Sequence, residues 1–294
     1  MQFKLHHDLR DMSVSIGDVL QQAAQSLDRA GVADARREAG SLLSHVIAKD
    51  RTFLISHAED VITDRELREF KEAVQRRAAG EPAQYITGVQ DFYGRTFRVT
   101  PDVLIPRPET ELLVEAALPW MNTDSNVCDV GTGSGCIAVT LLCERENARA
   151  VAVDVSAAAL EIARQNARQH SVESRILLKL SDCFSGLDPN TDQFDLIVSN
   201  PPYVSAKAWP GLQREVRDHE PLVALSPGGD GLSVIRRLLS EAPAFLKIDG
   251  HLLMEVGFDQ GEAVRNFVDD RVWTLRDVLP DLQGIPRIVM LQRK

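Results

Sequence analysis

The sequence has no long hydrophobic run and relatively little positive charge. No apolar stretch reaches the roughly 18 residues that a membrane-spanning helix needs, so we expect no membrane association. The first residues, MQFKLHHDLRDM, lack the apolar segment of a signal peptide. Lys and Arg number 33 against 43 Asp and Glu, which gives a net charge of −10. Because non-specific nucleic-acid binding depends on clustered positive charge, this balance argues against a stable nucleic-acid complex.

Cysteine and histidine are also sparse, and neither forms a recognisable metal or redox motif. The four cysteines contain no CxxC pair, and the seven histidines contain no HxxxH or HxH pair. We therefore predict no metal site and interpret the cysteines as buried free thiols. Free thiols are typical of a reducing compartment, so we expect a cytoplasmic protein.

The first part of the chain has the apolar spacing of helices. Hydrophobic residues make up 44% of the sequence and charged residues 26%, as in a soluble protein with a substantial core. Apolar residues recur every three or four positions over residues 15–30, 34–47 and 63–78. Asp34 is expected to cap the second of these helices, and Thr63 with Glu66 forms a capping-box pattern for the third. We assign residues 1–80 to a helical bundle that contacts a macromolecular substrate.

The pattern changes after Gly80-Glu81-Pro82. Short extended runs at residues 84–88, 91–94 and 96–99, separated by glycines, predict a β-hairpin linker over residues 81–106. Pro108, followed by acidic residues, predicts a helix that continues to about Leu118. We assign residues 107–294 to the second domain.

The second domain alternates strands with helices, which is typical of an α/β fold with a doubly wound, largely parallel sheet. The predicted helices lie at residues 136–143, 157–170, 231–246 and 260–268. The predicted strands lie at residues 127–130, 150–154, 176–180, 194–198, 251–256, 272–275 and 287–292. In such a sheet, ligands bind outside the carboxyl ends of the strands.

A glycine-rich loop follows the first of these strands. Its residues are Gly131, Thr132, Gly133, Ser134 and Gly135. Glycine lets the backbone approach a ligand closely, and Asp154, at the end of the next strand, is placed to accept hydrogen bonds from ribose hydroxyls. The G-x-G-x-G spacing differs from the dinucleotide fingerprint, and no G-x-x-x-x-G-K phosphate motif is present. A nucleoside cofactor without phosphates fits better, and S-adenosylmethionine is the obvious candidate.

A second loop, Ser181-Asp182-Cys183-Phe184, follows the third strand. Asp182 could receive the amino group of adenine. Phe184 could pack on the adenine ring or belong to the core, and the sequence leaves both alternatives open.

The third loop is Asn200-Pro201-Pro202-Tyr203, after an apolar strand. Two prolines remove two backbone donors and leave carbonyls free to accept, while Asn200 adds a side-chain carbonyl. Together with the ring of Tyr203, such a site suits a planar NH2 group. The alternative is a strand that ends in a stiff turn.

These stretches resemble the class I S-adenosylmethionine-dependent methyltransferases, and among them the bacterial protein-(glutamine-N5) methyltransferases that modify peptide-chain release factors. The similarity covers residue 80 to the C-terminus. Its matching segments are Phe92-Tyr93-Gly94, Leu104 to Glu111, Asp129 to Gly135, Asn200 to Tyr203, Gly228 to Leu232 and Glu255-Val256-Gly257. The Ile-Pro-Arg-Pro-Glu-Thr stretch is what distinguishes this family from adenine methyltransferases, which share Asn-Pro-Pro-Tyr.

The resemblance implies a seven-stranded methyltransferase sheet and a defined reaction. A methyl group would pass from S-adenosylmethionine, leaving S-adenosylhomocysteine, to the glutamine amide of a Gly-Gly-Gln loop, which tunes translation termination. Asn200, Pro201 and Tyr203 would be catalytic, and Pro202 would also contact the substrate. The glycine loop, Asp154, Asp182, Cys183, Phe184 and Asn200 would contact the cofactor. The family often has an aromatic residue where Cys183 stands, and Phe184 is a candidate substitute.

Other functions remain as alternatives. A DNA or RNA adenine-N6 methyltransferase uses Asn-Pro-Pro-Tyr on a flipped base, but the chain lacks a basic, aromatic-rich recognition segment. A helical adaptor with a degenerate nucleotide fold would bind no cofactor. A dinucleotide-dependent oxidoreductase is disfavoured by the glycine spacing. We expect the protein to act as a monomer.

Overall fold

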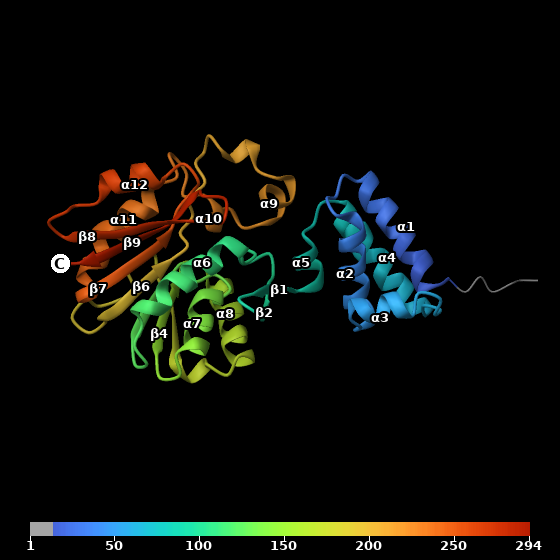
Figure 1. Cartoon of the computed structure of the whole chain (residues 1–294), viewed down its shortest axis with the longest axis horizontal. Coiled ribbons are helices and arrows are strands. Elements are labelled where there is room, and N and C mark those ends of the chain that lie inside the picture. Colours follow the sequence, from blue (N-terminus) through green and yellow to red (C-terminus); the bar gives the residue numbers. More distant parts are fainter. Residues whose placement is uncertain (1–13) are drawn as a thin grey trace, which may run out of the picture. The chain divides into compact units, whose positions relative to one another are not determined.

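The computed structural model describes residues 14–294 and separates into two compact units, which divide between Thr87 and Gly88. Residues 1–13, where we interpret the sequence as lacking a signal peptide, lie outside the described residues. Figure 1 shows one unit made of helices only and one made of a sheet with helices on both faces. Within residues 14–294, no helix is both long enough and apolar enough to cross a membrane.

The first unit is built on three amphipathic helices. These are α1 (Ile16–Arg29), α2 (Ala35–Ile47) and α4 (Asp64–Ala78). The short helix α3 (Arg51–Ser56) lies between α2 and α4, and the short helix α5 (Ala83–Thr87) follows α4. Leu27, Leu42 and Phe70 bring the apolar faces of the three long helices into one core. The capping box is confirmed, because Thr63 and Glu66 each accept a bond from the other's backbone N–H.

Three details of this unit differ from the sequence-based expectations. Asp34 precedes α2, but its side chain makes no capping bond, because its backbone is left-handed with φ of 53°. Residues 84–88 were expected to be extended, yet α5 covers most of them. The Pro82 carbonyl accepts from the N–H groups of Tyr85 and Ile86, which closes a helical turn. Helix α3 was not predicted, and Asp50 caps it through the Phe53 N–H at 2.8 Å.

The second unit begins with an antiparallel hairpin of β1 (Val89–Phe92) and β2 (Arg95–Arg98). A seven-stranded sheet follows within the described chain, with strand order β5-β4-β3-β6-β7-β9-β8, of which the last two pairings are antiparallel. Its strands are β3 (Asn126–Val130), β4 (Arg149–Asp154), β5 (Ile176–Leu180), β6 (Phe194–Ser199), β7 (Leu246–Glu255), β8 (Trp273–Pro280) and β9 (Pro286–Arg293). The predicted sheet is therefore confirmed.

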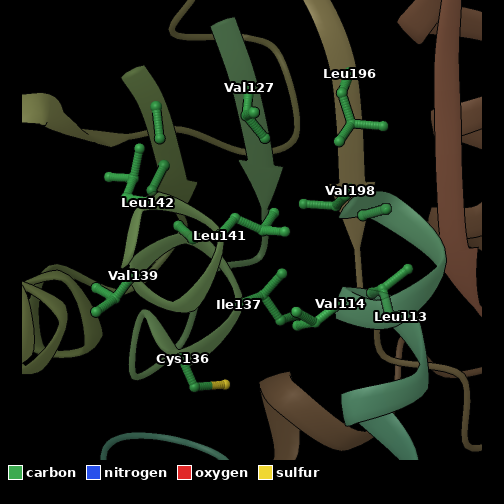
Figure 2. Packing of buried hydrophobic residues seen from close by; sticks show 14 of the residues in the cluster. Leu113, Val114, Val127, Cys136, Ile137, Val139, Leu141, Leu142, Leu196 and Val198 are labelled. Atoms are coloured by element: carbon green, nitrogen blue, oxygen red, sulfur yellow. The ribbon is translucent and has the colours of Figure 1, made fainter. Parts of the chain in front are cut away.

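Two layers of helices cover this sheet. One layer consists of α6 (Pro108–Ala117), α7 (Cys136–Glu144) and α8 (Ala157–Gln169), and the other of α11 (Ser233–Glu241) and α12 (Gly261–Phe267). The short helices α9 (Arg214–His219) and α10 (Leu222–Leu225) lie in the segment between β6 and α11. Side chains of β6 alternate between the faces: Leu196 and Val198 belong to the cluster with α6 and α7, and Ile197 to the cluster with α11 and α12. Figure 2 shows Leu113, Ile137 and Leu141 packed beside Leu196 and Val198.

The order of the strands fixes where a ligand can bind. From β3 the chain moves outward through β4 and β5, then returns to β6 on the other side of β3. Connections therefore leave the carboxyl ends of β3 and β6 in opposite directions, which opens a crevice there. Ser199 links the two ends, because its hydroxyl donates to the Val130 carbonyl at 2.7 Å.

Candidate active site

A cavity of about 220 Å³ opens at this crevice. Four loops line it, at the ends of β3, β4, β5 and β6, and the start of α6 closes one side. The predicted site residues that it brings together are Gly131, Thr132, Gly133, Ser134, Asp154, Asp182, Cys183, Asn200, Pro201 and Pro202. Predicted residues as far as 71 positions apart in the sequence, from Gly131 to Pro202, thus line one surface.

Three predicted residues do not line this cavity, and each has another structural role. Phe184 is buried in the core and stacks on Phe245, with ring centroids 4.8 Å apart, so the core alternative holds for it. A Cβ at Gly135 would lie 3.1 Å from the Cβ of Ala163, so this glycine serves the contact between α7 and α8. Tyr203 directs its hydroxyl to Glu255.

The glycine loop is held open by the carboxylates around it. Asp154 accepts from the N–H groups of Gly133 and Ser156, both at 2.9 Å. Asp129 accepts from the Thr132 hydroxyl at 2.7 Å and from the Ala138 N–H. A Cβ added at Gly131 or Gly133 would meet no atom within 4 Å, so the backbone there faces free space. The loop thus presents exposed backbone to a ligand.

The charges of the lining favour a cationic ligand over a phosphate. The lining contains three aspartates, Asp102, Asp154 and Asp182, but Arg107 as its one basic residue in the described chain. Arg107 is itself paired with the buried Glu220, which also accepts from the Ile105 N–H. Burial raises the pKa of Glu220, and the Arg107 guanidinium opposes that rise. The Asp182 carboxylate accepts a hydrogen bond from the Arg237 guanidinium, with 2.7 Å between Nη1 and Oδ1.

These features agree with a sulfonium nucleoside such as S-adenosylmethionine. The carboxylate of Asp154 is half-buried beside the open glycine loop and can accept bonds from hydroxyl groups. Cys183, at a left-handed position with φ of 49°, lines the cavity with a small side chain. Within residues 14–294, no group of three metal-ligating side chains occurs.

Asn200 and Pro201 offer acceptors on the other side of the cavity. The Nδ2 group of Asn200 donates to the Thr110 hydroxyl at 3.0 Å. Within residues 14–294, neither Asn200 Oδ1 nor the Pro201 carbonyl accepts a hydrogen bond from the protein. Both oxygens are therefore available to an N–H donor that enters the cavity.

Sequence reasoning missed the residues that support Asn200. Thr110 lines the cavity and donates to Glu255 at 2.7 Å, and Glu255 also accepts from the Tyr203 hydroxyl at 3.1 Å. Burial raises the pKa of Glu255 and that of Tyr203. Both Thr110 and Glu255 lie in segments that carry the family resemblance, which was the available signal. Their pairing was not visible, because 145 residues separate them.

Comparisons with known proteins cover both units. Residues 18–88 match a family model described as the PrmC N-terminal domain, and residues 108–218 match one described as the methyltransferase small domain. The chain is 46% identical to the release factor glutamine methyltransferase of Cereibacter sphaeroides, over 92% of this chain and 96% of that protein. It is 43% identical to the protein of the same name from Koribacter versatilis, over 94% and 98%.

Similarity to solved structures supports the sheet alone. A methyltransferase from Pyrococcus furiosus superposes with a TM-score of 0.51, at 16% identity, over 68% of this chain and 90% of that one. At this level of identity the match shows a shared fold and nothing more.

Proposed function

The chain belongs to the release factor glutamine methyltransferase family, and we propose that its cavity binds S-adenosylmethionine beside the glutamine of a Gly-Gly-Gln loop. The reaction transfers one methyl group to the side-chain amide nitrogen of that glutamine. The observation that carries the site assignment is the pair of unoccupied acceptors, Asn200 Oδ1 and the Pro201 carbonyl, at the edge of the cavity.

The residues that would hold the cofactor are those of the glycine loop with Asp154, and Asp182 and Cys183 on the adenine side. When bound, S-adenosylmethionine supplies a methyl group on a positively charged sulfur that leaves readily. The three lining aspartates favour that positive charge.

An amide nitrogen is a poor nucleophile, because its lone pair is delocalised into the carbonyl. The two acceptor oxygens of Asn200 and Pro201 would each take one N–H of the substrate amide. Such bonds hold the nitrogen in place and favour the positive charge that develops on it, and both effects lower the barrier. No strong general base is required, since the nitrogen becomes acidic once it is methylated and can lose its proton to solvent.

The decisive variant is Asn200→Ala. It should reduce kcat by at least ~10²-fold, as expected for loss of one preorganised polar group, and leave the cofactor Kd nearly unchanged. Mass mapping of release-factor peptides measures the methyl transfer, and calorimetry measures the Kd. Asn126→Ala, at the opposite end of β3 and outside the cavity, is the matched control. Turnover within a few-fold of wild type in Asn200→Ala would refute the assignment.

The substrate class is tested with the same assay. Purified release factor should gain one methyl group on the loop glutamine, and duplex DNA should gain none. Label in DNA alone would instead identify an adenine methyltransferase. We also propose that the enzyme works as a monomer in the cytoplasm and forms no stable nucleic-acid complex, in keeping with its net charge of −10.

A further inference from the structure

A chain of hydrogen bonds runs from Asn200 into the interior of the second unit. Asn200 Nδ2 donates to Thr110 Oγ1 at 3.0 Å, and Thr110 Oγ1 donates to Glu255 Oε2 at 2.7 Å. The other carboxylate oxygen of Glu255 accepts from the Tyr203 hydroxyl at 3.1 Å. The members come from the loop after β6, from α6 and from the end of β7. Thr110 and Glu255 are only 2% and 1% exposed, so water does not compete for these bonds.

The donors and acceptors in this chain can be counted. A threonine hydroxyl has a single hydrogen, and that of Thr110 is directed to the Glu255 carboxylate. Toward Asn200, the Thr110 oxygen therefore has only lone pairs and can act only as an acceptor. An asparagine amide has two orientations that differ by exchange of its oxygen and nitrogen. The orientation with Oδ1 toward Thr110 would place two acceptors against each other, so the Nδ2 group must lie there.

The surroundings of Glu255 support its role as an acceptor. Burial raises its pKa overall, while the hydroxyl bonds from Thr110 and Tyr203 and the charge of Arg287 on β9 oppose that rise by favouring the carboxylate. A buried carboxylate that accepts two hydroxyl bonds is well satisfied. Replacement of either donor would leave part of it without a partner.

We propose that Thr110, with Glu255 as its acceptor, is a positioning residue that fixes the orientation of the Asn200 amide, so that Oδ1 faces the incoming NH2 group of the substrate. This inference rests on the proposed function, because it assigns Asn200 the role of acceptor for that group. It adds Thr110 and Glu255 to the site, and their contribution is to select one of the two orientations of the Asn200 amide. Thr110 touches neither reacting atom in this scheme and acts through Asn200.

The test compares Thr110→Val, which removes the hydroxyl at nearly constant volume, with Thr110→Ser, which keeps it. Thr110→Val should lower kcat roughly tenfold to a hundredfold, as expected for a misdirected reacting group. The KM for release factor and the cofactor Kd should stay within about twofold, and Thr110→Ser should restore most of kcat. Thr140→Val is the matched control, because the Thr140 hydroxyl on α7 is buried without a hydrogen-bond partner in the described chain.

A double-mutant cycle separates positioning from simple support of the fold. In the Asn200→Ala background, Thr110→Val should change kcat by less than about twofold, because the amide that it orients is gone. An equal loss of kcat in both backgrounds would overturn the proposal, and so would a Thr110→Ser variant as slow as Thr110→Val.

A readout without substrate keeps this inference separate from the proposed function. In protein labelled with ¹⁵N at asparagine, the Asn200 side-chain amide is identified by its disappearance in Asn200→Ala. Its protons should exchange slowly with solvent in wild type and Thr110→Ser, and quickly in Thr110→Val. If the wild type fails to methylate release factor while this pattern holds, the substrate assignment fails and the orientation of the amide stands. Equal exchange in all three proteins would overturn the inference.

Discussion

Asp129 is a buried carboxylate that supports the glycine loop without lining the cavity itself. It lies near the end of β3 and is fully buried. Oδ2 accepts from Thr132 and Ala138, but Oδ1 has no hydrogen-bond partner in the described chain. Burial raises the pKa of this carboxyl to about 7, and the bonds from Thr132 and Ala138 only partly oppose the rise. The folded protein therefore binds a proton here that the unfolded chain releases near pH 4.

This difference predicts a pH dependence of stability. Between the unfolded pKa of 3.8 and the folded value of about 7, the folded state holds more protons at Asp129 than the unfolded state. The contribution of Asp129 to the free energy of unfolding therefore falls as pH rises, by up to about 1.4 kcal/mol per pH unit. Asn at this position cannot ionise. The Tm of Asp129→Asn relative to wild type should therefore increase from about pH 5 to about pH 7, with both proteins free of cofactor.

Thermal unfolding at several pH values gives the comparison, and Asp195→Asn is the control. Asp195 is partly exposed and paired with Lys247 at 2.7 Å, so its replacement removes a carboxylate that is not buried. A Tm difference for Asp129→Asn that is flat with pH would contradict a raised pKa for the buried carboxyl.

Individual side chains show how far the sequence predicts a site. Asp154 and Asn200 were correctly expected at the cavity, because Asp154 ends a strand and Asn200 directly follows one, and the apolar pattern of both strands is clear. The core role of Phe184 could not be decided, because an aromatic residue after a strand can point to either side. Thr110 and Glu255 were missed as a pair, since a hydrogen bond between distant segments leaves no local pattern.

At the scale of elements, the two outer glycines of the loop serve different neighbours. Gly131 has φ of 76° and free space around its Cα, whereas Gly135 has φ of 80° and lies against Ala163 of α8. Left-handed backbone is unfavourable for alanine at both positions, by about 1–2 kcal/mol. At Gly135 a Cβ would also press on the Cα of Ala163 at 3.2 Å, so α7 and α8 would have to separate.

Gly135→Ala should therefore lower the free energy of unfolding by about 2–4 kcal/mol, because the cost of overpacking against Ala163 is added to the cost of the left-handed backbone. Gly131→Ala should lower it by only about 1–2 kcal/mol. The methyl group at position 131 would enter the free space where we propose that the cofactor binds, so the main effect of Gly131→Ala should be a weaker cofactor Kd. Urea denaturation and calorimetry measure the two quantities. Equal losses of stability in both variants would rule out the contact with Ala163 as the reason for Gly135.

Whole elements were predicted well where local signals agreed with tertiary packing. Buried strands such as β3 and β6 are short, largely apolar segments in a chain that alternates strands with helices, and α4 has a capping box at its start. The prediction of an extended run at residues 84–88 was wrong, because the alternation of apolar and polar residues there is also typical of a strand. In the structure, the Pro82 carbonyl starts a helical turn. The short helices α9 and α10 were not predicted, because four to six residues give too little periodicity to detect.

At the scale of the whole molecule, the chain contains separate hydrophobic cores. The hydrophobic core of the first unit ends at Ile86, and the two clusters of the second unit begin at Phe92 and at Cys128. Every residue that lines the cavity lies between Asp102 and Val234. The cavity that we propose for the cofactor therefore belongs to the second unit alone, and we propose that the first unit serves recognition of the release factor.

This division of labour predicts the behaviour of a fragment that begins at Gly88. Since the fragment keeps both of its clusters and the entire cavity, it should unfold cooperatively and bind cofactor with a Kd within about threefold of the full chain. Without the helical unit, kcat/KM for intact release factor should fall at least ~10-fold, while a short Gly-Gly-Gln peptide should be methylated equally by both proteins. The peptide is the internal control, because it reports the chemistry without the larger contact surface. If the fragment methylates intact release factor as efficiently as the full chain does, the helical unit has no part in recognition.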